Sequence, residues 1–300
     1  AVINSSLYGV VSEGMRHPEA IEHVYGMING IEGFLNGTVL DFAEALPGEK
    51  LDGLKVTPGA YLGSCRYKLP ESLEDPVYPR LFKKFEEMNI GWFFYIGGND
   101  SMDTADKLSR WAANNHKDIS FIGVPKTIDN DLPVTDHTPG YGSAARYVAS
   151  TVREIVLDAS VYQQPAVTIV ELMGRHAGWL AGAAGLATAM GAGPDLVYLP
   201  ETDFDMKKFL ADVKRIYDEK GNCLVAVSEG IHYADGSFVS EAKTSATDGF
   251  GHAQLGGLAA LLANILKEKT GAKVRGIELS LLQRCAAHCA SQTDIDEAYL

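Results

Sequence analysis

The sequence predicts an α/β fold built on mostly parallel sheets. A short apolar run, a turn containing Gly or Ser and a helical pattern follow one another repeatedly along the chain. This alternation is typical of βαβ units, in which a helix connects two parallel strands. With 300 residues, 46% hydrophobic and 22% charged, the chain is long enough for two ordinary domains, each with its own core. Ligands of such sheets bind at the carboxyl ends of the strands, so the segments that follow the strands are the first candidates for a site.

The predicted elements follow one another in a regular order. In the first half, a strand over 92–96 precedes a helix from about 101 to 113, and a strand over 121–124 leads into a loop over 125–133. The second half has strands over 167–170, 196–199 and 224–227, with helical patterns ending near 189 and spanning 206–217. The chain opens and closes in helix-like segments, and we interpret both ends as cut.

Composition argues against several classes of partner. The net charge of −13 disfavours nucleic acid, whose phosphate backbone needs a basic surface. No run of about eighteen apolar residues is present, so we expect no membrane span. Four cysteines, without a CxxC pair or the spacing of a zinc site, predict reduced thiols in a cytoplasmic protein. Two of them, Cys285 and Cys289, could share a helix face.

The segment 123–131 carries the strongest local signal. Lys126, Asp129 and Asp131 lie directly after a predicted strand. One carboxylate could act as a general base, the other could lie near a metal, and the lysine could bind a phosphate. A surface turn with solvated charges explains the same residues equally well, because loops favour Asp and Asn.

The segment Gly-Gly-Asn-Asp-Ser at positions 97–101 joins a predicted strand to a predicted helix. Glycines there let backbone N–H groups approach an anion, and the helix dipole adds to the attraction. The alternative is a plain helix start with Asp100 or Ser101 as its N-cap.

A third segment, 171–178, places Arg175 after the strand over 167–170. An arginine there suits the charge that develops on a transferred phosphoryl group. A structural ion pair is the alternative, and we interpret the adjacent His176 as a hydrogen-bonded structural residue.

Together these segments resemble the phosphofructokinase family, specifically its pyrophosphate-dependent type, in order, spacing and context. The matching segments lie at 24–26, 29–33, 63–68, 97–101, 127–131, 173–175, 228–230 and 283–284. The resemblance implies two Rossmann-like α/β domains with mostly parallel sheets that face each other across a cleft. A phosphoryl-donor domain would span 1–140 plus about 288–300 and lack its first strand, and a sugar-phosphate domain would span 141–287.

The implied reaction is the Mg²⁺-dependent transfer of a phosphoryl group from pyrophosphate to the 1-hydroxyl of fructose 6-phosphate. It gives fructose 1,6-bisphosphate and phosphate, is reversible, and serves glycolysis or gluconeogenesis. By resemblance, Asp129 is the base for the hydroxyl proton, Thr127 contacts the sugar or the transferring group, and Arg175 stabilises the transition state. The same resemblance implies a cytoplasmic homodimer or homotetramer.

The resemblance assigns further residues to the sugar phosphate. Met173 and Gly174 would offer their backbone, Glu229 would accept a sugar hydroxyl, and Arg284 would hold the 6-phosphate. The histidine of the family's His-x-Gln-Arg motif is replaced by Leu281. Arg275 resembles an arginine that some members lend to a neighbouring subunit.

Two positions indicate the donor. Members that use ATP have glycine where this chain has Asp100 and Lys126. A carboxylate at Asp100 would repel the α-phosphate of ATP, and Lys126 offers pyrophosphate a cation. The residues that the resemblance assigns to donor binding are Gly97, Gly98, Asp100, Ser101, Lys126 and Arg66.

The metal site departs from the family pattern, because Asn99 stands where an aspartate often faces Mg²⁺. An amide oxygen can still bind the ion, and we expect Asn99 and Asp131 to lie near it. Three alternatives remain at this point. They are an ATP-dependent phosphofructokinase, a non-catalytic sugar-phosphate-binding protein, and a nicotinamide dehydrogenase, which the lack of GxGxxG at a strand end disfavours.

Overall fold

The computed structural model describes residues 2–240 and 257–300. Its contacts divide the chain into two compact units. Unit 1 is Ala1–Thr127 with Ser291–Leu300, and unit 2 is Ile128–Ala290. The first boundary therefore lies ahead of the expected position near residue 140. Ile128 is buried in a core of unit 2, and the side chain of Asn130 binds the backbone of Asp136 and Thr138, so this segment belongs with unit 2.

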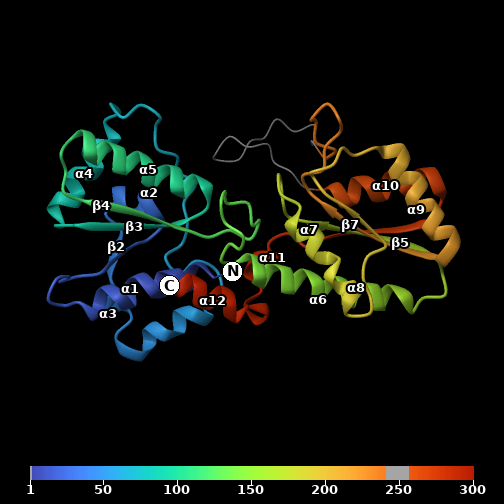
Figure 1. The fold of residues 1–300 in the computed structure, drawn as a ribbon, viewed down its shortest axis with the longest axis horizontal. Helices are drawn as coiled ribbons and strands as arrows, with labels where there is room; N and C mark the ends of the chain where they lie inside the picture. The colour runs from blue at the N-terminus through green and yellow to red at the C-terminus, as the bar shows by residue number, and fades with distance from the viewer. Residues whose placement is uncertain (1, 241–256) are drawn as a thin grey trace. The chain divides into compact units, whose positions relative to one another are not determined.

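Unit 1 combines short strands with helices (blue to green in Figure 1). Its parallel pair β3 and β4 runs in register from Trp92 beside Ser120 to Gly97 beside Pro125. The elements of unit 1 are α1 (Ile3–Arg16), β1 (Tyr25–Met27), α2 (Gly30–Leu35), β2 (Val39–Asp41), α3 (Phe42–Ala45), the 3-10 helix η1 (Gly48–Val56), α4 (Val77–Glu87), β3 (Trp92–Gly97), α5 (Asn99–Asn114), β4 (Ser120–Pro125) and α12 (Gln292–Tyr299).

An aromatic core joins α4 to this strand pair. The buried residues of α4 recur at helical spacing, at Tyr78, Leu81, Phe82 and Phe85. Phe85 packs against Phe93 of β3 at a ring separation of 5.3 Å. One face of α4 is therefore buried against the sheet, which fixes the strands whose ends carry the predicted donor residues.

Unit 2 is a four-stranded sheet in the order β6-β7-β5-β8, and all its pairs are parallel. Its elements are α6 (Tyr141–Ser160), β5 (Ala166–Leu172), α7 (Trp179–Ala184), α8 (Leu186–Ala189), β6 (Leu196–Tyr198), α9 (Met206–Lys220), β7 (Asn222–Ser228), α10 (Leu258–Thr270), β8 (Lys273–Glu278), α11 (Leu282–Cys285) and the 3-10 helix η2 (Ala287–Cys289).

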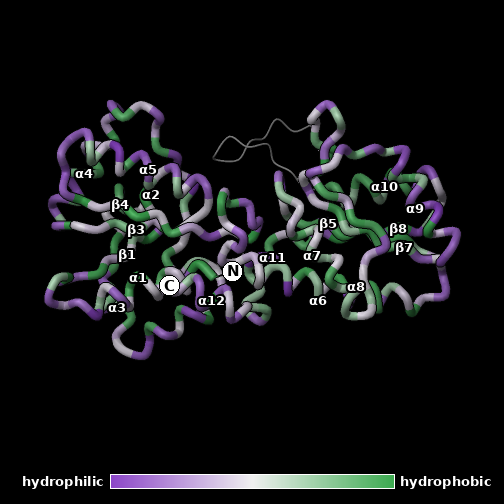
Figure 2. Tube along the Cα trace, viewed as in Figure 1, coloured by the Kyte–Doolittle hydropathy of each residue, from purple (hydrophilic) through white to green (hydrophobic). Residues whose placement is uncertain are grey.

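Helices cover both faces of this sheet (Figure 1). In β5, Val167 and Ile169 enter the core formed with α9 and α10, while Val170 and Leu172 enter the core formed with α6 and α7. Because successive residues of a strand point to opposite faces, a strand covered on both sides is mostly apolar, and Thr168 and Glu171 are the polar residues of β5. Figure 2 shows the resulting hydrophobic colour along β5 and β7. The predicted α/β class with parallel sheets is confirmed.

Two local expectations need correction. The helical pattern that ends near residue 189 is interrupted at Gly185, which separates α7 from α8. Cys285 and Cys289 do not share a helix face, because the chain leaves helical geometry at Ala286, where ψ is 77°. Cys285 is exposed and Cys289 is buried, and all four cysteines are free. Within the described residues, no helix combines the length and apolar character needed to cross a membrane.

Candidate functional site

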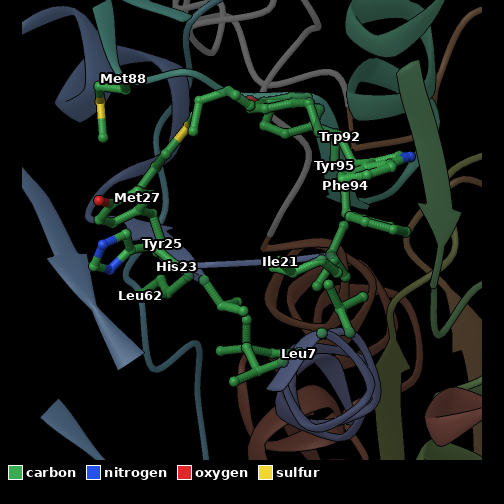
Figure 3. A pocket seen from close by; sticks show the side chains of 18 of the residues that line it. Leu7, Ile21, His23, Tyr25, Met27, Leu62, Met88, Trp92, Phe94 and Tyr95 are labelled. Carbon is green, nitrogen blue, oxygen red and sulfur yellow. The ribbon is translucent and has the colours of Figure 1, made fainter. Parts of the chain in front are cut away.

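A cavity of about 630 Å³ opens in unit 1 beside α1 and β3 (Figure 3). Its walls include the apolar side chains of Leu7, Ile21, Trp92 and Phe94, and none of the predicted site residues lines it. The cavity follows the edge of β3 that faces away from β4, and in the described part of the chain β3 pairs with β4 alone. The lining includes the carboxylates of Glu22 and Asp118 and no lysine or arginine, so it does not suit a phosphate and the candidate site lies elsewhere.

The predicted donor segment occupies the carboxyl end of the β3–β4 pair. Gly98 is the N-cap of α5, and no side chain caps that helix, so the alternative with Asp100 or Ser101 as N-cap is wrong. Asp100 instead lies in the first helical turn, half-buried. A Cβ at Gly97 would lie 2.0 Å from Ser101 Oγ, so only glycine lets the Ser101 side chain fold back over the turn. No side chain caps the start of α5, and binding of an anion by its backbone N–H groups stays a prediction of the sequence.

Unit 1 carries the two predicted donor-binding cations, Lys126 and Arg66. Lys126 directly follows β4, and its N–H donates to Gly97 O at 2.9 Å, which ties it to the turn after β3. Arg66 is exposed on a loop whose start is anchored by a 2.7 Å hydrogen bond from Asn29 N–H to Leu62 O.

The Thr-Ile-Asp-Asn-Asp loop spans the boundary between the units. Thr127 is the last residue of the first part of unit 1, whereas Asp129 and Asp131 belong to unit 2. Asn130 has φ 55° and fixes the loop, because its Oδ1 accepts the N–H of Thr138 at 2.8 Å. Asp129 is half-buried and Asp131 is exposed, so the two carboxylates lie in different environments.

The Met-Gly-Arg loop is held at the carboxyl end of β5. Gly174 has φ 130°, a conformation that side chains rarely adopt. Its carbonyl accepts a 2.5 Å hydrogen bond from Ser228 Oγ, and its N–H donates to Glu229 Oε1 at 3.3 Å. A Cβ at Gly230 would lie 1.8 Å from the carbonyl oxygen of Arg175, so glycine is required there as well. The ends of β5 and β7 therefore determine where Arg175 lies.

Glu229 lies in an environment that disfavours its charge. Burial raises the pKa of this carboxyl above its ordinary value, and the Asp129 and Glu278 carboxylates raise it further. The N–H of Gly174 and the charge of Arg175 act in the opposite direction. Asp129 and Arg175 of unit 2 therefore lie within electrostatic reach of Glu229. Arg175 and Glu229 follow the carboxyl ends of β5 and β7, where parallel sheets bind ligands.

Arg284 is exposed on the single turn α11, which follows β8. The predicted Arg275 lies within β8, opposite Thr168 of β5, and stacks on the Tyr162 ring at 5.1 Å. The structure therefore places Arg284, but not Arg275, after the carboxyl end of a strand.

Sequence reasoning assigned no role to two buried polar residues. Gln283 is 1% exposed and accepts the N–H of Met173 at 3.1 Å. Glu171 is 2% exposed and accepts the N–H of Ala259, the second residue of α10, at 2.8 Å. A carboxylate within the apolar strand β5 is the signal that could have identified Glu171.

Two oxygen ligands are available for a divalent cation. Asn99 is exposed at the first residue of α5 and offers an amide oxygen, and Asp131 offers a carboxylate. Both are hard donors of the type that Mg²⁺ prefers, but they belong to different units, so their shared metal role stays a prediction of the sequence.

Comparison with known proteins gives one consistent family. The family model described as Phosphofructokinase matches residues 1–293. A pyrophosphate–fructose 6-phosphate 1-phosphotransferase of Xanthomonas campestris is 46% identical over 305 residues, which cover 99% of this chain and 71% of the relative. Its counterpart from Halomonas elongata is 42% identical over 303 residues, covering 100% of this chain and 72% of the relative.

A solved structure agrees with these relatives. The crystal structure of a pyrophosphate-dependent phosphofructokinase from Marinobacter aquaeolei has a TM-score of 0.84 and 40% identity, covering 100% of this chain and 70% of its own. The sequence match and the fold therefore lead to the same conclusion: the chain belongs to the phosphofructokinase family.

Proposed function

We propose that this protein is a phosphotransferase that uses pyrophosphate to phosphorylate fructose 6-phosphate at its 1-hydroxyl. The observation that carries the proposal is that Asp129 and Arg175 lie close enough to Glu229, the residue after β7, to shift the pKa of its carboxyl. The names of the similar proteins support the same substrates. The products are fructose 1,6-bisphosphate and phosphate.

Each group has a distinct chemical task. Asp129 accepts the proton of the 1-hydroxyl as its oxygen attacks phosphorus, and the bond to the departing phosphate breaks. Arg175 stabilises the charge that spreads over the transferring group. Glu229 binds Gly174 N–H with one oxygen and can accept a sugar hydroxyl with the other. Arg284 can hold the 6-phosphate through paired hydrogen bonds.

The donor is bound by residues of unit 1. The uncapped start of α5 offers N–H groups, and Lys126 and Arg66 offer positive charge. Asn99 and Asp131 would be the protein ligands of Mg²⁺, which supplies charge neutralisation for pyrophosphate when bound. A homodimer or homotetramer in the cytoplasm completes the proposal.

The choice of donor is tested by a coupled assay with purified protein. With fructose 6-phosphate and Mg²⁺, we expect turnover with pyrophosphate and scarcely any with ATP, because the Asp100 carboxylate would repel the α-phosphate of ATP. The double change Asp100→Gly and Lys126→Gly should introduce measurable ATP turnover and weaken pyrophosphate use.

A matched control is Asp106→Gly with Lys117→Gly, which alters the same residue types in the middle of α5 and just after its end. This control should keep the preference for pyrophosphate. Equal or better turnover of the unmodified protein with ATP would reject the pyrophosphate assignment.

A further inference from the structure

The segment that carries Arg284 has little structure of its own. After β8 the chain passes through Ser280, whose φ of 44° is strained for a residue with a side chain. It then forms α11, a helix of only 4 residues, which is too short to be stable by itself. Leu281 and Leu282 are each 56% exposed, so burial of these side chains contributes little to anchoring the turn. Another interaction must hold Arg284 in place.

Gln283 supplies that interaction. Its side chain is 1% exposed, although both neighbours in sequence, Leu282 and Arg284, are exposed. The Gln283 carbonyl oxygen accepts the N–H of Met173 at 3.1 Å, and its amide nitrogen donates to Ser280 O at 3.2 Å. One side chain therefore binds both the strained residue before α11 and the loop that carries Arg175.

A primary amide meets the hydrogen-bonding requirements of this position at any pH. A backbone N–H can only donate and a backbone carbonyl can only accept, so the side chain between Met173 and Ser280 must offer one acceptor and one donor. Glutamine does so at the right length. An ionised glutamate offers acceptors only, and methionine leaves the Met173 N–H without this partner, which is costly in a buried environment.

The same loop is held from its other side by Glu229 and Ser228, which bind the N–H and the carbonyl of Gly174. A continuous set of hydrogen bonds thus runs from Ser280 through Gln283 and the Met173–Gly174 backbone to Glu229. It connects the residues proposed to bind the 6-phosphate, the transferring group and a sugar hydroxyl.

We propose that Gln283 is a positioning residue, which fixes Arg284 relative to Arg175 and Glu229 so that one fructose 6-phosphate can reach all three. This inference rests on the proposed function, because it takes fructose 6-phosphate as the ligand. Gln283 itself needs no contact with the sugar.

The test measures the dissociation constant of fructose 6-phosphate by calorimetry, with Gln283→Met, Arg284→Ala and the unmodified protein. Gln283→Met keeps the side-chain volume but loses both hydrogen bonds, so we expect roughly ten-fold weaker binding, in the same direction as Arg284→Ala. The Michaelis constant for pyrophosphate should change by less than about two-fold, because binding of the donor does not depend on the hydrogen bonds of Gln283. The control Gln164→Met, at an exposed position ahead of β5, should leave both values unchanged.

A second variant separates positioning from simple packing. In Gln283→Glu, burial raises the pKa of the introduced carboxyl, and its protonated form again offers one donor and one acceptor. We therefore compare the affinity of Gln283→Glu for fructose 6-phosphate with that of the unmodified protein at the same pH. This ratio should rise by about three-fold or more when the pH is lowered from 8 to 6. The same ratio for Gln283→Met should stay constant.

The outcomes are distinguishable from those of the proposed function. If the unmodified protein does not bind fructose 6-phosphate, the proposed function and this inference both fail. If it binds, and folded Gln283→Met binds equally well, only the inference is overturned. Loss of folding in both variants, or an affinity of Gln283→Glu that does not depend on pH, would show a structural role alone and also overturn it.

Discussion

At the scale of single residues, the site depends on carboxylates that share one environment. Asp129 and Glu229 repel each other, and burial adds to the effect on the Glu229 pKa. Arg175 and the N–H of Gly174 offset part of this cost. A buried carboxyl whose pKa is raised by burial and by a second carboxylate is typical of a functional site, since a purely structural position gains nothing from the repulsion.

We expect Asp129→Asn to lower kcat by roughly two to four orders of magnitude while fructose 6-phosphate still binds, because the amide keeps the shape but cannot take the proton. Steady-state kinetics with pyrophosphate and calorimetry with the sugar phosphate measure the two effects. Asp136→Asn, in the exposed part of the same loop, is the matched control and should retain activity. Near-normal kcat for Asp129→Asn would remove this residue from the mechanism.

At the scale of elements, a side chain of the strand β5 accepts a hydrogen bond from the N-terminal turn of the helix α10. The N-cap of α10 is Gly257, and no side chain at that position caps the helix. Glu171 of β5 accepts the N–H of Ala259 instead. Burial raises the pKa of Glu171 to about 7, with further contributions from the Glu278 and Glu229 carboxylates and opposition from the N–H groups of Ala259 and Leu258.

This shift predicts a pH-dependent stability. The folded protein keeps a proton on Glu171 up to about pH 7, whereas the unfolded chain releases it near the ordinary value of 4.5. The native state therefore binds more protons in that window, and the Glu171 contribution destabilises the fold as pH rises through it. Glu171→Gln should raise the free energy of unfolding at pH 8 by roughly 3 kcal/mol and leave it nearly unchanged at pH 4.5.

Urea unfolding across this pH range measures the effect, with the exposed Glu268→Gln of α10 as the control. Parallel stability curves for Glu171→Gln and the unmodified protein would contradict the assignment.

The turn after β7 gives a second prediction at this scale. Gly230→Ala places a Cβ 1.8 Å from the carbonyl oxygen of Arg175, so the backbone of one of the two segments must move. We expect kcat to fall by roughly ten- to one-hundred-fold, because displacement of Arg175 disturbs the geometry of the transition state. A Cβ at Gly182 of α7 would meet no atom within 4 Å, so Gly182→Ala should leave the enzyme active. Similar kinetics for the two variants would show that the close approach of Gly230 to Arg175 does not position Arg175.

At the scale of the whole molecule, unit 1 is completed by residues distant in sequence. α12 packs on α1, and a Cβ at Gly9 would lie 2.2 Å from the carbonyl oxygen of Tyr299. The rings of Tyr8 and Tyr299 are 5.6 Å apart, and Arg16 donates to the Tyr299 hydroxyl at 3.1 Å. The C-terminal residues thus cover the first helix of the chain.

Removal of residues 291–300 should therefore destabilise unit 1, on the order of 2 kcal/mol, because the buried side of α1 becomes exposed. Thermal unfolding followed by near-ultraviolet circular dichroism measures the loss. Removal of Leu300 alone, which is 99% exposed, is the control and should have no effect. Equal melting temperatures for the two truncations would show that α12 does not support α1.

The sequence by itself determined the local features. The alternation of apolar runs and turns predicted β3, β4, β5 and β7, because a run of apolar residues bounded by turn residues is typical of a strand in a βαβ unit. The segments 127–131 and 173–175 could be recognised because their residues are neighbours in the chain. Tertiary structure alone decided the contacts between distant segments, such as Gln283 with Met173 and Glu171 with Ala259. It also decided that Asp129 belongs with unit 2. Such pairings depend on how sheets and helices pack, which no local pattern of residues encodes.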